Sequence, residues 1–120
     1  NLDRVDEVPQ FDFVILGMGD DGHTASIFPH EIDLWNAADH CVVATHPDSG
    51  QERVSINGKV INKAKEVVFL VTGESKAEKV EEIINKTGNY KTYPASLVNP
   101  ESDKLVWFLD QSAATGITAD

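Results

Sequence analysis

One short segment of the sequence gathers the residue types that can move a proton. Asp20, Asp21 and His23 lie close together in a run that reads Gly17-Met-Gly-Asp-Asp-Gly-His-Thr-Ala-Ser-Ile-Phe-Pro29. An unperturbed imidazole has a pKa of about 6.5, so much of it is neutral at pH 7 and can accept a proton from water. The glycines allow tight turns and let a ligand approach backbone N–H groups closely. We therefore expect a functional site here.

Common ligand signatures do not fit this segment. Its glycines have the wrong spacing for a dinucleotide-binding loop, and no Gly-Lys-Ser/Thr is present for a Walker phosphate loop. Asp20, Asp21 and His23 offer three metal ligands but no clear fourth. We expect no metal, and we interpret Asp20 as a solvated side chain.

Short apolar runs predict the strands that must position this segment. Apolar residues at consecutive positions suit parallel strands that are covered on both faces. A further run, Arg53–Ile56, alternates between polar and apolar residues and predicts a half-exposed strand. In α/β folds, ligands bind beyond the carboxyl ends of strands, and the glycine-rich segment follows the first run directly. The four apolar runs are Phe11–Leu16, Cys41–Thr45, Val67–Val71 and Leu105–Leu109.

Helical patterns separate these runs. Asn57 is a candidate helix cap, and Ser75 with Glu78 has the spacing of a capping box. Pro94–Val98 predicts one further helical turn. The alternation of strands and helices predicts an α/β, Rossmann-like fold with a mostly parallel sheet flanked by helices. No linker divides the chain, so residues 1–120 form a single domain or part of one.

Composition and charge limit the function classes. The 120 residues include 10 basic and 20 acidic side chains, which gives a formal charge of −10. We expect no binding to nucleic acid or anionic membranes, because both need a basic surface. A small anion can still bind where a few donors converge. No apolar run approaches the ~20 residues of a membrane span, and no signal-peptide core is present, so we expect a cytoplasmic protein.

Several conspicuous side chains are interpreted as structural. Cys41 is the only cysteine, which excludes an intrachain disulfide, and its apolar neighbours predict a buried thiol. Trp35 and Trp107 are expected to pack in the interior. The other histidines (His30, His40 and His46) are expected to be solvated or to cap backbone groups, and Glu81 and Glu82 to form a solvated helix face.

The glycine-rich segment resembles the signature of the 6-phosphogluconolactonase family, hydrolases of the pentose phosphate pathway. The shared pattern is Gly-x-Gly-x-Asp-Gly-His-x-Ala-Ser-x-Phe-Pro, which begins here at Gly17. The resemblance spans nearly the whole chain. Later elements similar to those of the family are Arg53-Val54-Ser55, Gly73-x-x-Lys76, Pro94-Ala95-Ser96 and the closing run Leu105–Asp110.

The resemblance implies hydrolysis of 6-phospho-D-glucono-1,5-lactone to 6-phospho-D-gluconate. No cofactor is required, because the ester carbonyl is already electrophilic. His23 would activate the water, and Asp21 would either orient the imidazole or shape the loop. The N–H groups of Gly19 and Gly22 would bind the developing oxyanion.

Arg53 and Lys76 are the candidates for the phosphate. A guanidinium makes two parallel charge-assisted bonds to such a group, and Lys76 lies at the start of an expected helix, where anions are favoured. The structural alternative for each is a surface ion pair.

The chain departs from the family in its length. Family domains are about twice as long, and their earlier half supplies a Ser-Gly-Gly loop and an Asp-Glu-Arg segment that do not occur here. We therefore interpret the chain as the later half of a larger domain. Half a sheet would leave an edge strand and apolar surface open, which predicts self-association.

Two alternative functions stay open. The related glucosamine-6-phosphate isomerases/deaminases have a glutamate just before the proline that closes this loop, whereas this chain has Phe28 before Pro29. An apolar ring cannot relay protons, so Phe28 favours the lactonase. The other alternative is a non-catalytic fragment that binds a sugar phosphate.

Overall fold

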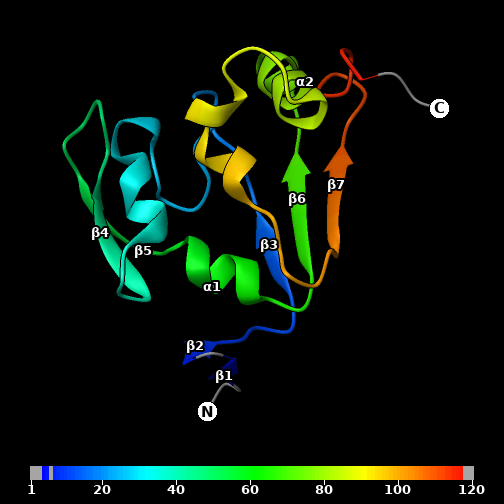
Figure 1. Cartoon of the computed structure of the whole chain (residues 1–120). Helices are drawn as coiled ribbons and strands as arrows, with labels where there is room; N and C mark the ends of the chain where they lie inside the picture. Colours follow the sequence, from blue (N-terminus) through cyan, green and yellow to red (C-terminus); the bar gives the residue numbers. More distant parts are fainter. Residues whose placement is uncertain (1–3, 6, 118–120) are drawn as a thin grey trace.

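The computed structural model describes residues 4, 5 and 7–117. Its main sheet has three parallel strands in the order β3–β6–β7, formed by Val14–Leu16, Val67–Val71 and Leu105–Leu109. Figure 1 shows β6 in the middle of this sheet, with α2 beyond its carboxyl end. The predicted α/β fold with a parallel sheet and flanking helices is confirmed.

Two α-helices and four short 3-10 helices connect the strands in the described part of the chain. The predicted cap of the first helix is confirmed, because the Asn57 side chain accepts a hydrogen bond from the Val60 N–H at 3.4 Å. Within the described residues, no helix has the length and apolar character to cross a bilayer. The helices are η1 (Pro29–Asn36), α1 (Gly58–Lys63), η2 (Glu74–Lys76), α2 (Ala77–Asn85), η3 (Tyr90–Thr92) and η4 (Pro94–Leu97).

The capping box expected before α2 is wrong. No side chain caps α2, which follows directly on η2. The Ser75 hydroxyl instead donates to the Asp20 carboxylate at 3.0 Å, across 55 positions of the chain. A tertiary contact with the loop after β3 has therefore replaced the local cap.

The run Cys41–Thr45 does not join the main sheet. It forms β4, which pairs antiparallel with β5 (Glu52–Ile56), and β1 (Arg4–Val5) pairs antiparallel with β2 (Val8–Pro9). A two-stranded hairpin covers only one of its faces, so Ala44 is buried while Cys41 is exposed. The predictions of a covered parallel strand and a buried thiol at this run are therefore wrong.

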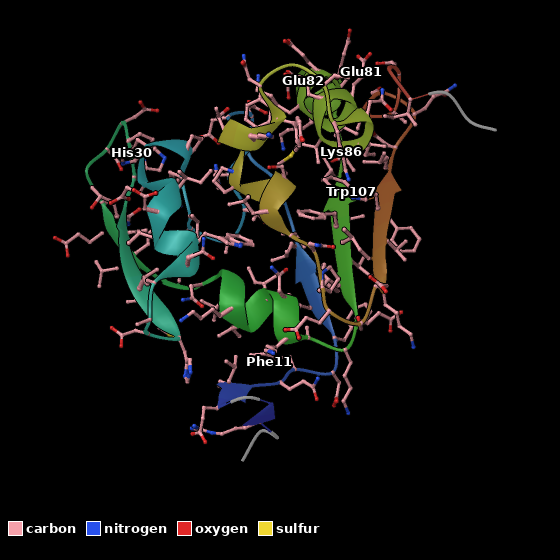
Figure 2. All side chains as sticks on the ribbon, viewed as in Figure 1. Phe11, His30, Glu81, Glu82, Lys86 and Trp107 are labelled. Carbon is pink, nitrogen blue, oxygen red and sulfur yellow. The ribbon has the colours of Figure 1, made fainter. Side chains whose placement is uncertain are left out.

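One face of the main sheet builds the core. Val67, Phe69 and Val71 of β6 are almost fully buried, and the Trp107 ring stacks on Phe69 with a centroid distance of 4.0 Å. Figure 2 labels Trp107 on this sheet. Trp35 is 3% exposed and is buried as predicted, whereas Trp107 is partly buried and packs against the edge of the core.

The opposite face of the main sheet is apolar and uncovered in the described structure. The strand register places Val68 between Ile15 and Val106, and Leu70 beside Phe108. Parallel sheets normally carry cover on both faces, which explains why these strands are apolar throughout. We call the exposed large side chains of this surface the open face: Phe13, Ile15, Leu70, Val106 and Phe108, between 42% and 63% exposed.

We propose that the purified chain self-associates through the open face and its neighbouring edges. Contiguous apolar patches of this kind are rare on monomeric proteins and favour association. Light scattering at tens of micromolar should give the mass of a dimer or a larger assembly. Leu70→Lys should lower that mass, whereas Val54→Lys, at a more exposed apolar position on the hairpin, should not. A monomer at that concentration would contradict the proposal.

Candidate active site

The loop between β3 and η1 is closed by its own hydrogen bonds. The Gly19 N–H donates to the His23 carbonyl at 2.9 Å, and the Gly22 N–H donates to the Gly19 carbonyl at 3.0 Å. The buried Thr24 hydroxyl donates to the Gly17 carbonyl at 2.8 Å. These bonds fold the loop back onto the carboxyl end of β3, where His23 is held.

Asp21 and His23 form the predicted carboxylate–imidazole pair. One carboxylate oxygen, Oδ1 of Asp21, lies 2.6 Å from Nδ1 of His23 and also accepts the His23 backbone N–H at 3.0 Å. The contacts that both proposed roles of Asp21 require are therefore present, since the same oxygen bonds to the ring and to the backbone of the turn. An ionised carboxylate only accepts hydrogen bonds, so in the neutral form of the imidazole the proton is on Nδ1 and the lone pair is on Nε2.

The surroundings of Asp21 keep it ionised. Partial burial raises the pKa of Asp21, but the hydrogen bonds from the His23 backbone and ring, with the charge attraction to that ring, outweigh it and lower the pKa below its ordinary value. A lowered pKa stabilises the fold above the unfolded value of about 3.9, and this contribution is lost as pH falls through the lowered value. The pair therefore persists at neutral pH.

Gly19 and Gly22 allow close packing around the pair. A Cβ on Gly19 would lie 2.1 Å from Cε1 of His23, and a Cβ on Gly22 would lie 2.7 Å from the Tyr93 ring. Gly22 also has a φ of 88°, which favours glycine. Their N–H groups already donate within the loop. Their predicted role as oxyanion donors stays a prediction, and the observed contacts support close packing instead.

Arg53 reaches the loop through Phe28. Its guanidinium carbon lies 5.9 Å from the centre of the Phe28 ring, and its Nε donates to the Gln51 side chain at 3.2 Å. Nearby on β5, the Ser55 hydroxyl accepts the Ser26 N–H at 3.0 Å. The hairpin is therefore tied to the loop, and Arg53 lies against it.

Lys76 approaches the loop from η2. Its Nζ donates to the Met18 carbonyl at 2.6 Å and lies 3.9 Å from the Asp20 carboxylate. Asp20 is exposed, as predicted for a solvated residue, but it also accepts the Ser75 hydroxyl. Both predicted phosphate ligands thus contact the same loop, Arg53 at Phe28 and Lys76 at Met18.

Tyr93 and Glu82 support the loop from behind. The Tyr93 hydroxyl donates to the Glu82 carboxylate at 2.9 Å, the Tyr93 ring packs on Gly22, and the Ala95 N–H donates to the Gly22 carbonyl at 3.1 Å. Figure 2 labels Glu82 on α2. The expectation that Glu82 is only a solvated helix residue is wrong. No local spacing connects these positions, so only the tertiary structure reveals them.

The phenol of Tyr93 is expected to titrate far above its ordinary range. Burial, the hydrogen bond to Glu82 and the charges of Glu82 and Glu78 raise the pKa of Tyr93 to about 12. Its contribution to stability is complete below an unfolded pKa of about 10 and is lost as pH rises through the folded value. In a Tyr90→Phe variant, which leaves one tyrosine, absorbance at alkaline pH should report this pKa. Titration near 10 in the folded variant would contradict the contact.

The His23 ring borders open space. It lines a shallow hollow of about 320 Å³ together with Met18, Gly19, Ala25 and the end of β3. Among the described residues, no group of three or more His, Cys, Asp or Glu side chains is placed to hold a metal ion. The arrangement places a hydrogen-bonded imidazole beside a small pocket, with two cations that contact the same loop.

Comparison with known proteins was made on sequence and on structure. A 6-phosphogluconolactonase of Treponema pallidum is 60% identical over 77 residues, which cover 64% of this chain and 32% of that protein. A 6-phosphogluconolactonase of Haemophilus influenzae is 45% identical over 103 residues, covering 86% of this chain and 44% of that protein. The chain thus spans less than half the length of these curated relatives.

The structural comparison agrees. The solved structure of a 6-phosphogluconolactonase from Trypanosoma brucei superposes with a TM-score of 0.81 at 30% identity, covering 92% of this chain and 44% of that one. Residues 1–107 match the family described as glucosamine-6-phosphate isomerases/6-phosphogluconolactonase. With more than half of its length matched, the chain belongs to this family.

Proposed function

We propose that this chain carries the water-activating part of a 6-phosphogluconolactonase site, which hydrolyses 6-phospho-D-glucono-1,5-lactone to 6-phospho-D-gluconate. The observation that supports this most is the Asp21–His23 pair, joined at 2.6 Å beside an open hollow. The relatives that bear the name 6-phosphogluconolactonase support this choice of substrate.

The proposed reaction begins at Nε2 of His23. This atom takes a proton from water as the water oxygen bonds to the lactone carbonyl carbon. The bond from that carbon to the ring oxygen then breaks, and the ring oxygen takes the proton back from the imidazolium. Asp21 stays ionised throughout and stabilises the positive ring by its hydrogen bond to Nδ1.

In this proposal the phosphate of the substrate binds to Arg53 and Lys76. Lys76 also lies 3.9 Å from the exposed Asp20 carboxylate, but the hydrogen-bond acceptors of the two cations, the Gln51 amide and the Met18 carbonyl, are neutral. A doubly charged phosphate competes well against such partners, because charge-assisted bonds are roughly twice as strong as neutral ones.

A cytoplasmic location forms part of the same proposal. The single cysteine of the sequence, Cys41, is exposed and free. An exposed free thiol suits a reducing compartment, where thiols are not converted to disulfides.

The deaminase alternative would need an acid at the position of Phe28. The Phe28 side chain is fully buried and packs on His23, so this position offers no proton relay. The alternative of a non-catalytic binder differs from the lactonase only in turnover, and an assay separates the two.

The test uses a chimera in which this chain replaces the matching segment of the Haemophilus influenzae relative, because the chain spans 44% of that protein. Lactone consumption is followed by coupled oxidation of the 6-phosphogluconate product. We expect turnover well above the spontaneous rate, and the 120-residue chain alone is assayed beside it. If the chimera binds 6-phosphogluconate without turning over the lactone, the non-catalytic alternative is supported. If the chimera shows no binding and no turnover, both functions are refuted.

Arg53→Gln in the chimera should raise KM about 10- to 100-fold with little change in kcat. A charge-assisted contact contributes about 1.5–3 kcal/mol, and a bond to the unreacting phosphate is the same in the substrate and the transition state. Steady-state kinetics measure both constants. Lys104→Gln, an exposed cation at the opposite end of the sheet, is the control. An unchanged KM would remove Arg53 from the phosphate site.

A further inference from the structure

The buried ring of Phe28 contacts two groups of the proposed site, the His23 imidazole and the Arg53 guanidinium. Its centre lies 4.7 Å from the His23 ring and 5.9 Å from the guanidinium carbon of Arg53. The rings of His46 and His30 lie 5.2 Å and 6.1 Å away, and Figure 2 labels His30 near the hairpin. Phe28 itself is 0% exposed.

We propose that Phe28 is a positioning residue that holds the His23 imidazole and the Arg53 guanidinium at fixed places on one aromatic ring. The proposal rests on the proposed function for the parts that these two groups play. Above, Phe28 served only to argue against the deaminase, because a phenyl ring cannot relay a proton. Here Phe28 has a role of its own in the arrangement of the site.

The packing around His23 explains why a third contact matters. Asp21 fixes the ring through Nδ1, and Gly19 leaves room for it at Cε1, but one hydrogen bond still permits the imidazole to tilt. The Phe28 ring lies at 46° to the imidazole and packs on it, which restricts that tilt. A fully buried aromatic side chain has little rotamer freedom, so it forms a rigid support.

The contact with Arg53 is a cation–π interaction. A guanidinium near an aromatic face is attracted to the ring and loses part of its conformational freedom. The separation of the base from this cation cannot exceed the sum of their distances to the shared ring centre. Such a limited separation between His23 and Arg53 suits a substrate whose reacting carbonyl and phosphate lie at opposite ends of one six-carbon sugar.

The chain offers a matched control for this role. Phe69 is also 0% exposed, and its ring stacks on Trp107 in the core of the main sheet. Phe28→Leu and Phe69→Leu make the same chemical change at equal burial. A merely structural effect of losing a buried ring therefore occurs in both variants, whereas a positioning effect occurs only in the first.

The first test is made by NMR on the 120-residue chain. We expect cross-relaxation between the Phe28 ring protons and those of His23 and Arg53. Phe28→Leu should shift the His23 ring and Arg53 Nε signals, Phe28→Tyr should largely restore them, and Phe69→Leu should leave them unchanged. Absence of these contacts in the unaltered chain overturns the proposal even if the leucine variants fail to fold. Equal shifts in both leucine variants overturn it as well.

The second test is kinetic and separates the two proposals. In the chimera, Phe28→Leu should lower kcat and raise KM, each about tenfold or more, because both the base and the cation are displaced. At a temperature where the Phe69→Leu variant is still folded, its kcat and KM should both stay within about twofold of those of the unaltered chimera. If the unaltered chimera shows no turnover, the proposed function fails while the NMR contacts still decide the role of Phe28.

Discussion

Replacing His23 with alanine in the chimera is expected to lower kcat by about 10²- to 10⁴-fold while KM stays nearly constant. A positioned general base contributes a factor of this size, and it acts in the transition state rather than in binding. The loss of kcat should be specific to His23, since in the described structure Asp21 holds no other imidazole. Stopped-flow or coupled assays at saturating substrate measure the change.

The control for this prediction is His40→Ala. His40 precedes β4 and contributes its backbone carbonyl to the Asn57 N–H, a bond that alanine retains. This variant should keep kcat within about twofold. An unchanged kcat in His23→Ala would show that the His23 imidazole has no part in the reaction. An equal loss of kcat in both variants would show that the effect is not specific to His23.

Gly19→Ala is expected to reduce kcat by about 10²-fold without unfolding the chain. The added Cβ would lie 2.1 Å from Cε1 and 2.2 Å from Nδ1 of His23, so the ring must move away from Asp21. The φ of Gly19 is not in the positive range, and alanine tolerates this backbone. A displacement of about 1 Å in a catalytic group can cost that factor.

Gly17→Ala tests whether the effect comes from the clash. A Cβ on Gly17 would meet nothing within 4 Å, although it lies in the same loop. Its kcat should stay within about twofold of the unaltered chimera, and thermal unfolding should show both variants folded. Full activity in Gly19→Ala would mean that the position of the His23 ring is not required.

The part of the site that is local in sequence could be predicted, and the part that depends on tertiary contacts could not. Asp21 and His23 are two residues apart in a loop that follows a strand, so the sequence offered their contact as one of two roles for Asp21. The packing of Phe28 against Arg53 joins the loop to a separate hairpin. The bond from Tyr93 to Glu82 joins α2 to the turn before η4. No periodicity encodes such contacts.

The errors in the fold have a related cause. An apolar run specifies a strand but not its partner, so Cys41–Thr45 resembled the parallel strands while it forms an antiparallel hairpin. Ser75 and Glu78 have the spacing of a capping box, but a hydroxyl bonds to the stronger acceptor within reach, here the Asp20 carboxylate. Local propensity decides such positions only where no tertiary partner competes.

The open face makes this polypeptide suited to bind a second polypeptide, as one part of a split protein. Its apolar side chains match what a sheet needs beneath a second layer of helices. Co-expression with the non-matching remainder of the Haemophilus influenzae relative would then yield a non-covalent complex in which this face is covered. The strength of that union would depend on Leu70 and Phe108, two side chains that take no part in the chemistry.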